Sequence, residues 1–202
     1  MAFIDGCNLK KYVEEKGKLP TGEALSIMLE ITRTVAYAHE QGVLHRDIKP
    51  ENIMIDHDGK IYLMDFGLAR QVASEDVSLT QQGTILGSPL YMSPEQAKGK
   101  KKIGFGTDIY SLGGVLYFML AGRPAFIKKE TFALLLEVTS KRPPSLRNFN
   151  PQVSPEIEWI AMKCLEKLPH KRYPSTKKLA RDLENLIAGK KTTFYSRSAL
   201  KR

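Results

Sequence analysis

The pattern of apolar and polar positions predicts a chain built mainly of helices. The segment from Pro20 to Gly42 is apolar around most of its circumference, which predicts a long buried helix. Asp108 to Ala121 is apolar nearly all round and is followed by Gly122, which predicts a central buried helix. Three further packing helices are predicted at about Glu130 to Val138, from Ser154-Pro155 to Glu166, and from Ser175 to Ala188.

Two regions of the sequence have β character instead. The apolar stretch from Met1 to Gly6 predicts the end of a strand, and the helical spacing from Asn8 to Gly17 predicts a short helix after it. Ile53 to Ile55 and Lys60 to Met64 are β-branched and apolar runs, and the residues between them, 56–59, have the composition of a turn. These two runs therefore predict a hairpin, and the whole pattern predicts a mainly α (α+β) fold.

Length and composition fit one globular domain. The chain has 202 residues, of which 42% are hydrophobic, and this is enough for a packed core. We expect residues 1–188 to form the domain and residues 189–202 to form a basic tail. The longest apolar run, Leu112 to Ala121, is shorter than the roughly 20 residues of a bilayer span, so we expect a soluble, cytoplasmic protein without a transmembrane segment. Cys7 and Cys164 are far apart and lack metal-binding spacing, so we expect neither a disulfide nor a zinc site.

The net charge of +9 raises the question of an anionic partner. Clustered lysine and arginine bind nucleic acid or an acidic membrane surface through electrostatic attraction and counterion release. The basic groups here are short and separated, and no nucleic-acid-binding motif accompanies them. They are Lys98–Lys102, Lys128-Lys129, Lys141-Arg142, Lys177-Lys178 and the tail from Lys190. We therefore expect no nucleic-acid partner, and we interpret these groups as solvated faces or as sites that recognise phosphorylated or acidic peptide.

Candidate chemistry is concentrated between Val43 and Asn52, Val-Leu-His-Arg-Asp-Ile-Lys-Pro-Glu-Asn, and in Asp65-Phe66-Gly67. An aspartate, a lysine and an asparagine within six residues, with a second aspartate after a hairpin, supply a base, a cation for phosphate and two oxygen ligands for Mg²⁺. Folding of the hairpin brings Asn52, at its start, beside Asp65, at its end. This set of side chains is the one that phosphoryl transfer requires. Any one of these residues alone would equally fit a polar turn.

These motifs, in family order with Ser93-Pro94-Glu95, resemble those of eukaryotic-type (Hanks-type) serine/threonine protein kinases of the kind also found in bacteria. The resemblance covers about residues 1–188. It implies the C-terminal lobe of a protein-kinase-like fold, ATP as phosphoryl donor, Mg²⁺ as cofactor and a protein Ser or Thr hydroxyl as acceptor. The alternative is a non-catalytic interaction module derived from a kinase lobe.

The resemblance also implies a role for each site residue. Asp47 would accept the proton of the substrate hydroxyl, Lys49 would contact the γ-phosphate, and Asn52 and Asp65 would bind Mg²⁺. The nucleotide would be bound by residues of the hinge and of the hairpin region. These are Ala2, Ile4, Glu51 and Met54.

A second group of residues is expected to support and switch the site. The polar stretch from Arg70 to Gly87 resembles an activation segment, in which a phosphorylated hydroxyl would pair with Arg46. The hydroxyls in and just after this stretch include Ser74, Ser78, Thr80, Thr84 and Ser88. Glu95 is expected to pair with Arg172, and Asp108 to hold the backbone of the catalytic loop from below.

The sequence also departs from the family pattern. No Gly-x-Gly-x-x-Gly occurs in it, so the Gly-rich loop, the strand lysine and its helix glutamate are expected upstream of Met1. We therefore expect little activity from these 202 residues alone, and a separate segment or a partner could supply the N-terminal lobe. Smaller departures are Leu168, where the family usually has aspartate, and the lead into Asp108 at residues 104–107.

Overall fold

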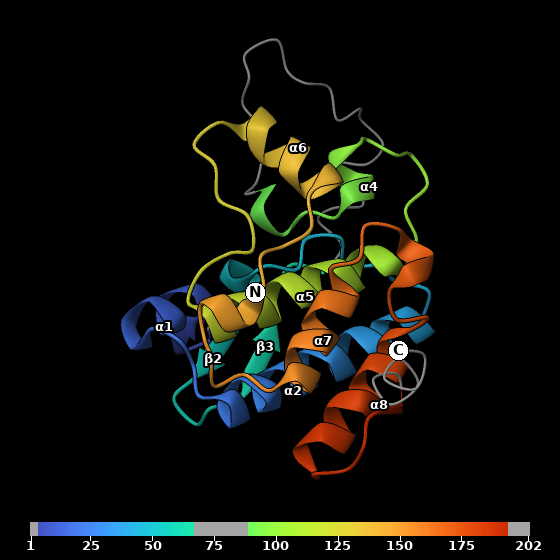
Figure 1. Ribbon diagram of the computed structural model, residues 1–202. Helices are drawn as coiled ribbons and strands as arrows, with labels where there is room; N and C mark the ends of the chain where they lie inside the picture. The colour runs from blue at the N-terminus through green and yellow to red at the C-terminus, as the bar shows by residue number, and fades with distance from the viewer. Residues whose placement is uncertain (1–3, 67–88, 194–202) are drawn as a thin grey trace.

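The most apolar helix, α5 (Gly106–Ala121), runs through the centre of the computed structural model, which describes residues 4–66 and 89–193 (Figure 1). Every residue of α5 from Thr107 to Ala121 is buried. Gly122 follows in the left-handed conformation and ends the helix, with its N–H donating to Phe118 O. The predicted central helix is confirmed, and it begins two residues earlier than the sequence pattern suggests.

Three more helices pack around α5 or against one another. Helices α2 (Thr21–Glu40) and α8 (Thr176–Ile187) lie side by side, and α7 (Pro155–Cys164) packs against α5 (Figure 1). The contact between α5 and α7 is close at Gly113, where a Cβ would lie 2.5 Å from the Cβ of Cys164. The sequence predicts all of these helices to within two residues at each end.

The small sheet is antiparallel, with strand order β1 (Gly6–Asn8), β2 (Ile53–Asp56) and β3 (Ile61–Leu63). The predicted hairpin is therefore confirmed as β2 and β3. The predicted strand before it is displaced, because β1 begins at Gly6 instead of ending there. Gly6 pairs with Asp56, and a Cβ on Gly6 would lie only 2.1 Å from Ile55 O. Glycine at this position permits a close approach of two strands and does not end one.

The remaining elements are short. Helix α1 (Leu9–Lys16) is capped by the side chain of Asn8, and α4 (Pro94–Ala97) lies near α6 (Thr131–Ser140) on one side of the molecule (Figure 1). Four 3₁₀ turns connect these elements within the described residues: η1 (Pro50–Asn52), η2 (Pro89–Tyr91), η3 (Leu146–Asn148) and η4 (Pro169–Lys171). Among the described residues, no helix combines the length and the apolar character that crossing a bilayer requires.

The chain just after α8 stays attached to the domain. Thr192 is fully buried, and its hydroxyl donates to a carboxylate oxygen of Glu156 in α7 at 2.5 Å. The backbone N–H of Thr193 donates to Asp182 of α8 at 2.8 Å. The described part of the segment that the sequence analysis assigns to the tail, residues 189–193, therefore packs against α7 and α8, and residues 194–202 lie outside the described residues.

Candidate active site

The loop between α2 and η1 is fixed by a carboxylate beneath it. Asp108, in the first turn of α5, is fully buried, and its two oxygens accept the backbone N–H groups of His45 at 2.9 Å and Arg46 at 2.8 Å. Arg46 has a φ of 68°, in the left-handed region that non-glycine residues seldom adopt. Such a conformation costs about 1 to 3 kcal/mol and persists only where surrounding contacts determine it. The bonds to Asp108 are contacts of this kind.

Asp47, Lys49 and Asn52 are brought together at the end of this loop. Lys49 Nζ lies 2.7 Å from Asp47 Oδ2, and Asn52 Nδ2 donates to the same oxygen at 3.0 Å and to Asp47 O at 2.9 Å. Asn52 is buried, whereas the Asp47 side chain is 49% exposed. The arrangement fixes one oxygen of an aspartate and leaves its carboxylate open to solvent.

The hairpin brings Asp65 to the same place. Met64, directly after β3, donates its N–H to Asn52 O at 2.8 Å and accepts a hydrogen bond from His45 Nε2 at 2.8 Å. Asp65 follows directly, with a φ of 63°. Phe66 then packs edge-on against the His45 ring, with 4.6 Å between ring centroids. Asp65 is therefore one residue away from a backbone hydrogen bond to Asn52.

The donor set around Asn52 and Asp65 fits Mg²⁺ bound together with a phosphate. Asn52 donates through Nδ2, which leaves Oδ1 free to bind a cation. The Asp65 carboxylate makes no hydrogen bond or ion pair within the described residues. Mg²⁺ in nucleotide sites uses one or two protein carboxylates, and phosphates and water supply the other ligands. A cluster of three or more His, Cys, Asp or Glu side chains that could hold a metal alone does not occur within residues 4–66 and 89–193.

The residues expected to bind the nucleotide lie in different surroundings. Met54 is opposite Asn8 in the pairing of β1 with β2, and Ile4 is half-buried just before β1. Glu51 forms an ion pair with Lys10 of α1 at 3.2 Å, and its other oxygen, Oε2, is buried without a hydrogen-bond partner among the described residues. Ala2 lies outside the described residues, so the structure places only Ile4 and Met54 of this set at the paired strands β1 and β2.

Glu95 and Arg172 form a buried, two-pronged ion pair. The two N···O distances are 2.7 and 2.8 Å, and Arg172 also donates to Gly106 O, Glu166 O and Lys167 O. Burial alone would raise the pKa of Glu95, but the hydrogen bonds and charge of Arg172 outweigh it and hold that pKa below its ordinary value. The pair joins α4 to η4 and to the first turn of α5.

The expected switch region is only partly visible. Thr80, Thr84, Ser88, the other hydroxyls of the stretch and Gly67 lie outside the described residues. Arg46, the expected partner of a phosphate, is half-buried, and its side chain forms no ion pair within the described part of the chain.

Two supporting residues were missed by the sequence analysis. His39, in the last turn of α2, lies with Nε2 2.8 Å from Asp108 Oδ2 and with Nδ1 3.2 Å from the Thr176 hydroxyl. Gln96 of α4 donates from Nε2 to Arg46 O at 2.7 Å, so the loop between α2 and η1 is held by α4 as well as by α5. His39 is one of several polar residues of α2, and the sequence gives no specific signal for it. Ser93 followed three residues later by Gln96 is the pattern of a capping box, which the structure has at the start of α4, but this pattern does not indicate the contact with Arg46.

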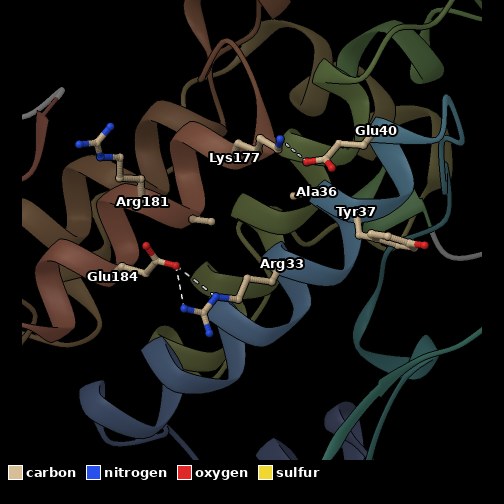
Figure 2. Close-up of a pocket in the computed structure, with 8 residues that line it drawn as sticks. Arg33, Ala36, Tyr37, Glu40, Lys177, Arg181 and Glu184 are labelled. Carbon is tan, nitrogen blue, oxygen red and sulfur yellow. Dashed lines mark hydrogen bonds and ion pairs between the residues drawn. The ribbon is translucent and has the colours of Figure 1, made fainter.

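A shallow groove lies between α2 and α8, away from these residues (Figure 2). Two ion pairs cross it, Arg33–Glu184 at 2.7 Å and Lys177–Glu40, and both are drawn as dashed lines in Figure 2. Arg181 points away from the groove in this view. These pairs join the two helices, and the groove contains none of the residues predicted for catalysis.

Comparison with known proteins places this arrangement in a family. The family model described as protein kinase domain matches residues 1–183. The serine/threonine-protein kinase PrkC of Bacillus subtilis is 38% identical over 187 residues, which cover 91% of this chain and 28% of PrkC. The serine/threonine-protein kinase PknB of Mycolicibacterium smegmatis is 34% identical over 189 residues, which cover 94% of this chain and 30% of PknB.

A solved structure agrees at the level of the fold. The crystal structure of Rad53 1-466 in complex with AMP-PNP matches with a TM-score of 0.72 and 24% identity, over 89% of this chain and 44% of that chain. The chain belongs to the protein kinase domain family, with bacterial serine/threonine kinases among its relatives. It spans under a third of the length of the two bacterial kinases named above.

Proposed function

We propose that this chain is the C-terminal lobe of a serine/threonine protein kinase and transfers the γ-phosphoryl group of ATP to a Ser or Thr hydroxyl of a protein. The observation that carries the proposal is the arrangement of Asp47, Lys49 and Asn52 on a loop held by Asp108. Phosphoryl transfer depends mainly on positioning and on charge stabilisation, and fixed side chains on a fixed backbone supply both.

Asp47 is the proposed catalytic base. Its Oδ2 is held by Lys49 and Asn52, and its exposed carboxylate can accept the proton of a substrate hydroxyl and orient that hydroxyl for attack. Lys49 already lies beside Asp47 and carries the positive charge that a transferred phosphoryl group requires.

Asn52 Oδ1 and the Asp65 carboxylate are the proposed ligands of Mg²⁺. The hydrogen bond between Met64 N–H and Asn52 O supports this assignment, because it ties the two ends of the hairpin together. When bound, Mg²⁺ neutralises charge on the ATP phosphates. Ala2, Ile4, Glu51 and Met54 are proposed to contribute to nucleotide binding.

The rest of the nucleotide site is proposed to come from a Gly-rich lobe outside these 202 residues, in the same protein or in a partner. The absence of a Gly-x-Gly-x-x-Gly sequence in the chain motivates this part of the proposal. Phosphorylation at Thr80, Thr84 or a neighbouring serine is proposed to regulate the enzyme by pairing with Arg46.

Transfer of labelled γ-phosphate to a protein substrate tests the proposal. We expect little transfer by the 202-residue chain, and clear transfer by an extended chain that carries a Gly-rich loop and a strand lysine ahead of residue 1. Asp65→Asn in the extended chain should weaken Mg²⁺-dependent ATP binding, because it removes a carboxylate charge that the hard cation requires. ATP binding without any transfer by the extended chain would favour a non-catalytic module. Full transfer by the 202 residues alone would contradict the proposal that part of the nucleotide site lies outside them.

A further inference from the structure

The loop between α4 and α5 carries an unpaired group of lysines. Four of the five residues from 98 to 102 are lysine, and all of them are exposed. Several other lysines of the described protein lie beside an acidic side chain, as Lys10 and Lys177 do. Within residues 4–66 and 89–193, no ion pair or side-chain hydrogen bond involves Lys98, Lys100, Lys101 or Lys102. Their charges therefore face solvent without a counterion from the described protein.

An ordered turn presents these lysines. Gly99 has a φ of 62°, its N–H donates to Gln96 O at 2.8 Å, and the N–H of Lys100 donates to Glu95 O at 3.0 Å. This pair of bonds with a left-handed glycine is a common way to end a helix. Positive charge at a helix C-terminus is itself favourable, but the effect fades within one turn and α4 has only four residues. Helix capping therefore does not account for the lysines at 100–102.

A second basic segment adjoins the first. Glu95 bonds through its backbone to Lys100 and through its carboxylate to Arg172, so both segments are attached to one residue. Figure 1 shows the chain after α4 descending beside the segment near residue 170. Residues 98–105 and 168–171, here called the basic surface, contain no acidic residue, and they add Lys171 to the four lysines. Phe105 and Leu168 in the same surface are 41% and 48% exposed.

We propose that the basic surface docks on a membrane surface that contains anionic lipid. The five cations are all lysines, whose point charges on long flexible stems respond to the summed potential of many headgroups. A site for one phosphorylated or acidic peptide would favour arginine, because its planar fork binds carboxylate or phosphate through two hydrogen bonds. Arg172, the arginine next to the surface, is buried and occupied by Glu95. Exposed Phe105 and Leu168 can enter the interfacial region of the bilayer.

Docking there would orient the catalytic loop. Gln96 lies between the basic surface and that loop, and it donates to Arg46 O at 2.7 Å. A membrane contact at residues 98–102 would therefore hold the loop at a fixed height and direction relative to the lipid. The binding itself does not depend on catalysis, so it can be measured whether or not the chain transfers phosphate.

Flotation of the 202-residue chain with lipid vesicles tests this proposal. We expect binding to vesicles of phosphatidylcholine mixed with phosphatidylglycerol, little binding to phosphatidylcholine alone, and release as salt is raised. The triple variant Lys100→Gln/Lys101→Gln/Lys102→Gln keeps Gly99 and the turn. It should bind about a hundredfold more weakly, since each lysine near an anionic surface contributes about fivefold. The control Lys11→Gln/Lys129→Gln/Lys178→Gln removes the same charge from scattered sites and should lose less than about tenfold.

Two results would overturn the proposal. One is an equal loss of binding by the loop variant and the scattered control, because the effect would then reflect net charge alone. The other is binding of duplex DNA or of a phosphorylated peptide that depends on Lys100–Lys102, in the absence of vesicle binding. The variant Leu168→Ser supplies a test that does not alter charge. We expect it to bind anionic vesicles several-fold more weakly at a salt concentration that still leaves the unchanged chain measurably bound, and equal binding there would contradict the apolar part of the proposed contact.

Discussion

At the scale of single residues, three aspartates of the site have distinct surroundings. The Asp47 carboxylate is half exposed and is held through one oxygen, whereas Asp108 is fully buried and accepts two backbone N–H groups. Asp65 sits at a left-handed backbone position after β3. The same side chain therefore has different physical consequences when it is replaced at each position, and chemistry can be separated from folding.

Asp47→Asn should abolish most turnover and leave the fold intact. The neutral amide cannot accept the substrate proton, and loss of a positioned general base typically lowers rates by about 10²- to 10⁴-fold. Because the side chain is half exposed, the melting temperature should change little. The measurements are kcat for the extended chain and thermal melting of the 202-residue chain. A fall in melting temperature with turnover preserved would reverse the roles assigned to Asp47 and Asp108.

Asp108→Ala should act first on stability. It leaves the buried N–H groups of His45 and Arg46 without an acceptor, and each unpaired buried donor costs about 1 to 3 kcal/mol. Urea unfolding of the 202-residue chain measures the loss. Asp108→Asn keeps one acceptor oxygen and should lose less than Asp108→Ala. Equal stability of the parent and both variants would show that water satisfies the loop backbone.

At the scale of elements, helices were predictable because apolar spacing and capping residues lie within each segment. Pro155 and Ser154 define the start of α7, and Ser175 defines the start of α8. The proximity of Asp47, Lys49 and Asn52 was predictable for a similar reason, since these residues are close in sequence. The position of β1 was not, because it depends on pairing between Gly6 and Asp56, fifty residues apart. Gln96 and His39 act through contacts that are equally remote in sequence.

Gly6→Ala tests the close approach of β1 and β2. The added Cβ would lie 2.1 Å from Ile55 O, so the strands must separate, and overpacking of this kind costs about 1 to 3 kcal/mol. Gly22→Ala is a matched control in α2, where nothing lies within 4 Å of the new Cβ. That change should stabilise the protein by about 0.4 to 1 kcal/mol. Chemical denaturation of both variants measures the difference, and a neutral Gly6→Ala would show that β1 can move away from β2 at no cost.

At the scale of the whole molecule, the ion pair of Glu95 with Arg172 joins segments that are far apart in sequence. It connects α4, next to the expected activation segment, with η4 and the start of α5. Gln96 continues this connection to the loop between α2 and η1 through Arg46 O. The site, the basic surface and the helical core are therefore all connected to this one buried ion pair. Loss of the pair should destabilise all three.

The pH dependence of stability should reveal this contact. The pKa of Glu95 is held below its ordinary value in the folded protein, so the unfolded chain takes up a proton first as the pH falls. The stabilisation is present above the unfolded pKa, near 4.5, and is lost as the pH falls through the lower folded pKa. Glu95→Gln should cost about 3 to 5 kcal/mol at neutral pH, because it leaves the Arg172 charge buried without its partner.

The difference in unfolding free energy between the parent and Glu95→Gln should therefore shrink as the pH is lowered below about 5. Urea titrations at a series of pH values measure it. The control Glu184→Gln removes the same charge from a surface pair with Arg33, whose two side chains are 43% and 59% exposed, and the difference from the parent should be smaller throughout. A constant difference for Glu95→Gln across this range would mean that the Glu95 carboxylate is not stabilised by Arg172, and the contact that joins α4 to the core would then owe its strength to packing alone.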